Sequence, residues 1–292
     1  MMNIDFEHIE TNGVGLHVAV SGPEEGDLVI LLHGFPEFWF SWRRQIRELA
    51  EAGYRVIAPD QRGFNKSDKP DGVGAYHIDT LRDDIIGLIH HFGQEEAAII
   101  GHDWGGAVGW HLASTRPDLV RGFVAINMPH LAVFPKVMLT TPLQWLRSSY
   151  MLFFQIPKVP EKIMSSNDYR YMEQALKMTS RKGTFTEEEL GAYKIAWARP
   201  KTLTSMLNWY RAMPSSMKSG RKHDIEVPVK IIWGKGDQFL SSKLAEESLK
   251  FIDSDAVIWV EDATHWVHQE QPEFVNDQLL RFLNKTASQI IS

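Results

Sequence analysis

The sequence predicts an α/β fold whose mostly parallel sheet is covered by helices on both faces. Short apolar runs recur along the chain and are nearly continuous rather than alternating, which is typical of strands buried on both faces. Helical patterns separate these runs, and such alternation favours a parallel sheet. The runs that we expect to be strands are residues 28–32, 55–58, 97–100, 120–126, 229–233 and 257–260. The helical patterns are residues 41–52, 78–92, 107–115, 242–252 and 272–283.

Two segments depart from this alternation. Residues 6–21 contain Asn12-Gly13 between two apolar runs, which predicts a hairpin and therefore an antiparallel edge of the sheet. From about residue 129 to residue 221 the strand pattern stops, and helix-like stretches rich in Met, Trp, Tyr and Phe follow. We expect residues 131–222 to form a helical cap, inserted between two parts of the core at residues 1–130 and 223–292.

Composition and charge exclude several classes of protein. The chain of 292 residues is long enough for one large core domain with an insertion. Its formal net charge of −6 gives nucleic acid or an anionic membrane little to bind. No apolar run is long enough to span a membrane, and the acidic N-terminus does not resemble a signal peptide. Since cysteine is absent, we expect a cytoplasmic protein. The sequence does not give the oligomeric state, and both a monomer and a homodimer stay open.

The strongest chemical signal is Asp103, which lies between glycines where a predicted strand meets a helical pattern. In the run Gly101-His-Asp-Trp-Gly-Gly106, the glycines permit the close backbone approach of a sharp turn that presents its middle residue outward. A carboxylate that attacks an alkyl carbon leaves an ester, which water can hydrolyse. Asp103 therefore predicts either the opening of a strained ring or the expulsion of a halide. The alternative is that Asp103 only caps the helix.

Two backbone N–H groups are candidates for an oxyanion hole. The run Leu32-His-Gly-Phe-Pro36 follows the first buried strand, and Trp104 follows the candidate nucleophile. In turns of this kind, the residue after His-Gly and the residue after the nucleophile donate to a developing oxyanion. We therefore expect Phe35 and Trp104 to supply these donors, with an ordinary strand-ending turn as the alternative.

A histidine and an aspartate follow the last two predicted strands. The chain order Asp103, Asp237, His265 is the order of nucleophile, acid and base in α/β-hydrolase folds. We expect His265, in its neutral form, to take a proton from water, and Asp237 to hold the histidine tautomer. Some relatives place the acid after the preceding strand, but Asn127 stands there. Asp262 is nearer to the histidine in sequence, yet this alone does not make it the partner.

These motifs resemble those of the α/β-hydrolase-fold epoxide hydrolases, and the resemblance covers nearly the whole chain. Residues 33–37, 60–70 and 101–106 are similar to signatures of that family, although relatives with other activities share them. The family carries two cap tyrosines, and the segments around Tyr150 and Tyr210 resemble those that bear them. The resemblance implies that these phenols hydrogen-bond the oxygen of a small lipophilic epoxide. It also implies that water is the second substrate and that no metal or organic cofactor is needed.

Aromatic and methionine side chains in the cap suggest a lipophilic pocket, although ordinary packing of cap on core is the alternative explanation. The pocket candidates are Phe35, Trp104, Met151, Phe154 and Trp209, and Trp145 and Met213 share the same apolar character.

Two other functions stay open. Haloalkane dehalogenases resemble this pattern and also carry Trp after the nucleophile, but often have Asn where this chain has Phe35. Fluoroacetate dehalogenases typically carry Arg in the place of Trp104. A non-catalytic receptor for a small ligand, built on the same fold, is the second alternative.

Overall fold

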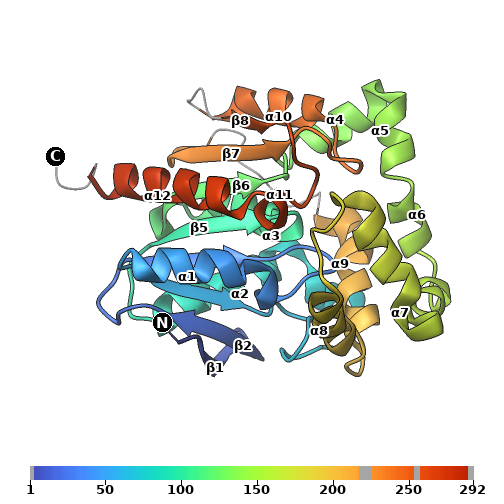
Figure 1. Cartoon of the computed structure of the whole chain (residues 1–292), viewed down its shortest axis with the longest axis horizontal. Helices are drawn as coiled ribbons and strands as arrows, with labels where there is room; N and C mark the ends of the chain where they lie inside the picture. Colours follow the sequence, from blue (N-terminus) through green and yellow to red (C-terminus); the bar gives the residue numbers. More distant parts are fainter. Residues whose placement is uncertain (1–2, 217–224, 253–256, 289–292) are drawn as a thin grey trace.

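A computed structural model describes residues 3–216, 225–252 and 257–288 (Figure 1). Within these ranges eight strands form one sheet in the order β1-β2-β4-β3-β5-β6-β7-β8. The β1–β2 and β2–β4 pairs are antiparallel and the others are parallel, which confirms the mixed sheet and its hairpin edge. The strands are β1 Asp5–Thr11, β2 Val14–Ser21, β3 Leu28–Leu32, β4 Arg55–Pro59, β5 Ala97–His102, β6 Val120–Ile126, β7 Val229–Gly234 and β8 Val257–Val260.

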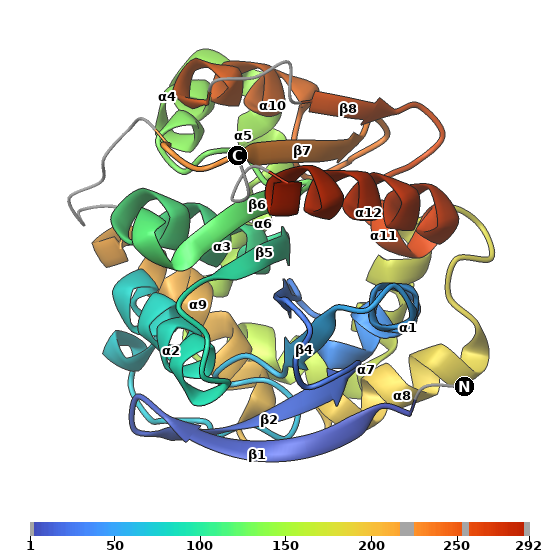
Figure 2. The same cartoon turned by 90° about the vertical axis from the view of Figure 1, so that its left-hand side faces the viewer.

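Helices cover both faces of the sheet (Figure 2). Helices α1 (Arg43–Glu51) and α12 (Pro272–Ser288) pack on one face, with Ile46, Leu49 and Leu279 in their shared apolar core. Helices α2 (Ile78–His91), α3 (Trp104–Thr115) and α10 (Ser242–Ser248) pack on the other face. This second core is continuous with the interior of the helices inserted between β6 and β7.

The inserted helices lie beyond the ends of the strands, at the right of Figure 1. They are α4 Val133–Thr140, α5 Pro142–Arg147, α6 Tyr150–Phe154, α7 Val159–Thr179, α8 Glu187–Trp197 and α9 Thr202–Ser216, and we call them the cap helices. The expected junction at residues 222–223 lies outside the described residues, so the domain boundaries stay a prediction. No helix in the described ranges is both long enough and apolar enough to cross a bilayer.

Helix α3 begins at Trp104, three residues earlier than the sequence pattern predicted. Gly105 and Gly106 are poor helix formers, but here they are required by packing rather than by helix propensity. A Cβ added to Gly105 would overlap the backbone carbonyl of Leu32, and one added to Gly101 would overlap the carbonyl of Gly105. The strand end and the helix start are therefore in direct backbone contact, and Asp103 lies in the turn between them.

We expect Gly105→Ala to lower the free energy of unfolding by about 2–3 kcal/mol, because the new methyl group meets immobile backbone. Urea unfolding followed by circular dichroism measures this change. Gly191→Ala is the matched control: it lies in α8 with no atom near its added Cβ, and should stabilise the protein by up to about 1 kcal/mol. Equal stabilities for the two variants would contradict this account of the turn.

Candidate active site

The ends of four parallel strands bring the predicted site residues together. Phe35 follows β3, Asp103 follows β5, Asp237 follows β7 and His265 follows β8. Because parallel strands place their carboxyl ends at one edge of a sheet, residues far apart in sequence meet there. The cap helices cover this edge, so the site lies between core and cap (Figure 1).

Asp103 is held in a strained turn and remains ionised. Its backbone has φ 47° and ψ −122°, in the left-handed region that side-chain-bearing residues rarely adopt. The Phe35 N–H donates to Oδ1 at 2.9 Å, and His265 Nε2 lies 3.7 Å from Oδ2. Burial raises the pKa of Asp103, but the contact with His265 and the charges of His265 and His102 outweigh burial and lower it. A carboxylate nucleophile therefore exists at neutral pH.

His265 lies between two carboxylates. Its Nδ1–H donates to Asp237 Oδ2 at 2.7 Å, while Nε2 faces Asp103. Burial lowers the pKa of His265, but the charge of Asp237 and the contacts with both carboxylates outweigh burial and raise it to about 10. In the free protein the ring is therefore an imidazolium at neutral pH, in contrast to the neutral form expected from sequence.

Asp237 is held by a set of donors that the sequence did not reveal. Asn127 Nδ2 donates to Oδ2 at 2.7 Å, and the N–H groups of Phe239 and Leu240 donate to Oδ1 at 2.7 and 2.9 Å. Asn127 thus stands where some relatives carry the acid, and here it orients the acid. The side chain of Asp262 is 86 % exposed and pairs with Arg181 instead.

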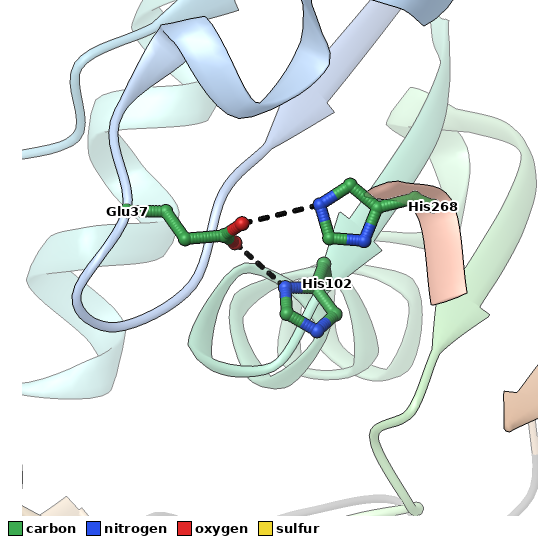
Figure 3. A group of neighbouring side chains, drawn as sticks. All are labelled: Glu37, His102 and His268. Atoms are coloured by element: carbon green, nitrogen blue, oxygen red, sulfur yellow. Dashed lines mark hydrogen bonds and ion pairs between the residues drawn. The ribbon is translucent and has the colours of Figure 1, made fainter. Parts of the chain in front are cut away.

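A second buried charge network lies beside this one (Figure 3). Glu37 Oε2 accepts from His102 Nδ1 at 2.7 Å, and Oε1 accepts from His268 Nε2 at 3.2 Å. His102 Nε2 donates to the backbone carbonyl of His265 at 2.9 Å, and the Gly34 N–H donates to Glu37 at 3.2 Å. Glu37 therefore connects the loop that presents Phe35 with the segments around the nucleophile and the candidate base.

The protonation states of this network follow from its contacts. Burial raises the pKa of Glu37, but the charge of His102 and the hydrogen bonds from His102 and His268 outweigh burial and hold it well below its usual range. Both ring nitrogens of His102 face oxygen atoms, one of the Glu37 carboxylate and one of the His265 carbonyl. Burial lowers the pKa of His268 to about 4, so this ring is neutral and donates only through Nε2. Glu37 and His102 lie in two motifs of the sequence and His268 lies in none, and nothing in the sequence indicates that the three residues meet.

Two hollows open on either side of Asp103. Their volumes are about 720 and 690 Å³, with their open mouths included. Asp103, Tyr150 and Tyr210 line both hollows, so the carboxylate and the two phenols lie where the hollows meet. The first hollow is otherwise lined mainly by Trp104, Met128, Leu131, Phe134, Met151, Met213 and Leu240. The second is lined mainly by Phe35, Phe154, Met164, Met172, Leu176, Phe239, His265 and Trp266.

The two tyrosines keep their phenolic protons. Their ring centroids are 6.0 Å apart, and Tyr210 packs edge-on against Trp104 at 5.1 Å. Burial raises the pKa of Tyr150, and burial together with the neighbouring Tyr150 raises that of Tyr210; the charge of Asp103 adds to both. Both hydroxyls can therefore donate hydrogen bonds to an oxygen in the hollows without adding a charge.

Two of the apolar cap residues lie elsewhere than the sequence suggested. Trp209 lines neither hollow: it is 1 % exposed, and its Nε1 donates to the Arg62 carbonyl at 3.0 Å. Since successive residues of a helix point about 100° apart, Tyr210 faces the site while Trp209 packs against the core. Trp145 is 51 % exposed and also lines neither hollow.

We expect Asp103→Asn to lower the pKa of His265 from about 10, because one of its two neighbouring negative charges is removed. An NMR titration of the imidazole carbon signals measures this, with deamidation of the new Asn excluded by mass. Asp262→Asn is the control, since this exposed carboxylate does not contact the ring, and its titration should match that of the native protein. An unchanged pKa in Asp103→Asn would contradict the coupling.

Comparison with known proteins places this geometry in a family. Residues 27–272 match the model of the alpha/beta hydrolase fold family. The chain is 50 % identical to "AB hydrolase superfamily protein YfhM" of Bacillus subtilis over 97 % of this chain and 99 % of that protein. It is 36 % identical to "Epoxide hydrolase 1" of Caenorhabditis elegans over 96 % of this chain and 70 % of that protein.

A solved structure agrees with these relatives. The crystal structure of a Bacillus megaterium epoxide hydrolase in complex with an inhibitor has a TM-score of 0.87 and 31 % identity, and the match covers 95 % of this chain and 100 % of that one. The shared fold extends over both the sheet and the cap helices. The chain therefore belongs to the alpha/beta hydrolase fold family.

Proposed function

We propose that the protein hydrolyses a lipophilic epoxide to a vicinal diol through a covalent ester on Asp103. The observation that carries the proposal is the meeting of one ionised carboxylate and two protonated phenols between two apolar hollows. An epoxide needs this combination, because its carbon requires a nucleophile while its oxygen requires a hydrogen-bond donor. The names of the relatives, which include epoxide hydrolases at 35–36 % identity, support the same substrate class.

In the first step Asp103 attacks a ring carbon. The Phe35 N–H holds Oδ1, which leaves Oδ2 as the attacking oxygen. A carbon–oxygen bond forms at Oδ2 as the ring C–O bond breaks, and Tyr150 and Tyr210 hydrogen-bond the departing oxygen. The ring oxygen then takes up one proton, for which the resting imidazolium of His265 has one to give. The products are a neutral hydroxyalkyl ester and a neutral His265.

In the second step His265 acts as the base. Esterification removes the negative charge of Asp103, which is one cause of the raised pKa of His265, and so favours the neutral ring. Neutral His265 takes a proton from water, and the resulting hydroxide attacks Cγ of Asp103. The N–H groups of Phe35 and Trp104 stabilise the tetrahedral anion. As the anion collapses, the bond from Cγ to Oδ2 breaks and Oδ2 takes the hydroxyl proton of the intermediate, which releases the diol. The imidazolium and a carboxylate that contains the water oxygen remain as the ion pair.

The covalent route predicts where the water oxygen goes in one turnover. With enzyme in excess over a simple aryl epoxide in ¹⁸O-labelled water, the diol should be mostly unlabelled and the label should reside in Asp103. Mass spectrometry of the diol and of the peptide that contains Asp103 measures both. His265→Gln is the companion variant: it retains the nucleophile but lacks the base of the second step. With solvent supplying the proton to the ring oxygen in place of His265, the intact protein should gain the mass of the epoxide. Label that enters the diol at once would show direct attack by water.

The two phenols should matter for an epoxide and not for a haloalkane. We expect Tyr150→Phe and Tyr210→Phe each to lower kcat/KM for epoxide opening by about 10²–10³-fold, because a donor to the developing oxyanion is lost. Tyr54→Phe is the control: its hydroxyl bonds Asn284 at the surface, and activity should stay within about twofold. Halide release from haloalkanes that survives both cap substitutions, with no diol formed, would identify a dehalogenase instead.

A further inference from the structure

The outer face of the first cap helices is unusually apolar for a protein surface. Leu146 is 72 % exposed, Leu152 is 59 % exposed and Trp145 is 51 % exposed. Further exposed apolar side chains follow on α5, on the link between α6 and α7, and at the start of α7, along one rim of the molecule (Figure 1). We call the following set the cap rim: Leu143, Trp145, Leu146, Leu152, Ile156, Val159 and Ile163.

The inner face of the same segment is apolar too. Tyr150, Met151 and Phe154 line the two hollows, while Leu152 and Ile156, interleaved with them, point outward into solvent. A helix that is apolar on all sides is normally buried on all sides. Exposed apolar side chains gathered on neighbouring elements are typical of a site of interaction with a protein or a membrane.

The net charge of the segment that carries the cap rim is positive, whereas that of the whole chain is negative. Residues 131–165 contain four cationic side chains and one acidic side chain, Glu161, although the formal net charge of the chain is −6. Glu161 is paired with Arg211 at 2.8 Å. Lys158 and Lys162 are exposed and have no ion pair among the described residues.

The other two cations of the segment are engaged. Lys136 lies 3.5 Å from Glu247, and Arg147 donates to the Asp237 carbonyl at 3.1 Å. The free positive charge is therefore concentrated at residues 158–162, between the rim residues Ile156 and Ile163 along the chain.

We propose that the cap rim docks on the surface of an anionic lipid bilayer. Leu and Trp side chains enter the boundary between headgroups and acyl chains, while lysine ammonium groups bind lipid phosphates. The rim lies on the surface of the bilayer without spanning it. The formal net charge of −6 predicts little affinity for anionic membranes. The proposal departs from that prediction, because residues 131–165 carry four cationic side chains and one acidic side chain.

A second copy of the chain fits the rim less well. A two-fold symmetric contact places the same patch on both partners, so Lys158 and Lys162 would meet their own copies. Like charges brought together in this way oppose association, whereas anionic headgroups attract them. Charge therefore favours lipid over self-association, and self-association becomes an outcome of the test.

Sedimentation with vesicles tests the proposal on the full chain. We expect the protein to pellet with vesicles of equimolar phosphatidylcholine and phosphatidylglycerol, and much less with phosphatidylcholine alone. Binding should weaken as NaCl is raised, because the Debye length falls from about 30 Å at 0.01 M to about 10 Å at 0.1 M. No substrate is present, so the result is independent of the proposed epoxide hydrolysis.

Two rim variants and two matched controls locate the contact. Leu143→Ser/Leu146→Ser should lower the bound fraction at least about fivefold, and Lys158→Glu/Lys162→Glu should abolish the preference for anionic vesicles. Phe274→Ser and Lys285→Glu, both on α12, alter one exposed apolar and one exposed cationic residue away from the rim and should bind like the native chain. Circular dichroism and thermal unfolding establish that each variant is folded.

Three results would overturn the proposal. One is native protein that stays in the supernatant with anionic vesicles at low salt. Another is binding that folded rim variants retain in full. The third is a native protein that sediments as a dimer, a Leu143→Ser/Leu146→Ser variant that sediments as a monomer, and no binding of either to vesicles. That result would assign the rim to contact between copies of the chain.

Discussion

The site depends on one imidazolium held between two buried carboxylates. Asp103 and Asp237 face opposite nitrogens of His265, so each charge is compensated by its neighbours rather than by water. A buried charge that loses its partner is costly, and this coupling explains why each carboxylate is also bound by backbone or amide donors. The second network, in which Glu37 holds His102, fixes the backbone carbonyl of His265 and keeps the ring between its partners.

Most of the sheet and the central site residues could be predicted because their signals are local. Each lies in a short motif after an apolar strand, and parallel strands bring such positions to one edge. The Glu37 network could not be predicted, since its members are separated by 65 and 231 positions along the chain and only the fold makes them neighbours. The start of α3 was misplaced for a related reason: Gly105 weakens a helix locally but permits its contact with Leu32.

In the cap, the helical segment was easier to predict than the face that each residue presents. Trp209 and Tyr210 are adjacent and both aromatic, yet one packs against the core and the other reaches the hollows. Helix α6 is apolar on all sides, and α5 buries the polar Gln144 while Trp145 is exposed, so apolar character does not distinguish inward from outward positions. Trp145 therefore looked like a pocket residue, although it belongs to the outer surface.

Asp103 lies at the N-terminus of α3, a helix of 12 residues whose unpaired N–H groups and dipole favour a negative charge at that point. The same local field, together with His265 and His102, disfavours any state in which the side chain of Asp103 is neutral. In the proposed reaction the ester is such a state, so this field raises its free energy relative to the regenerated carboxylate. The electrostatics of the resting protein thereby favour hydrolysis of the ester over its accumulation.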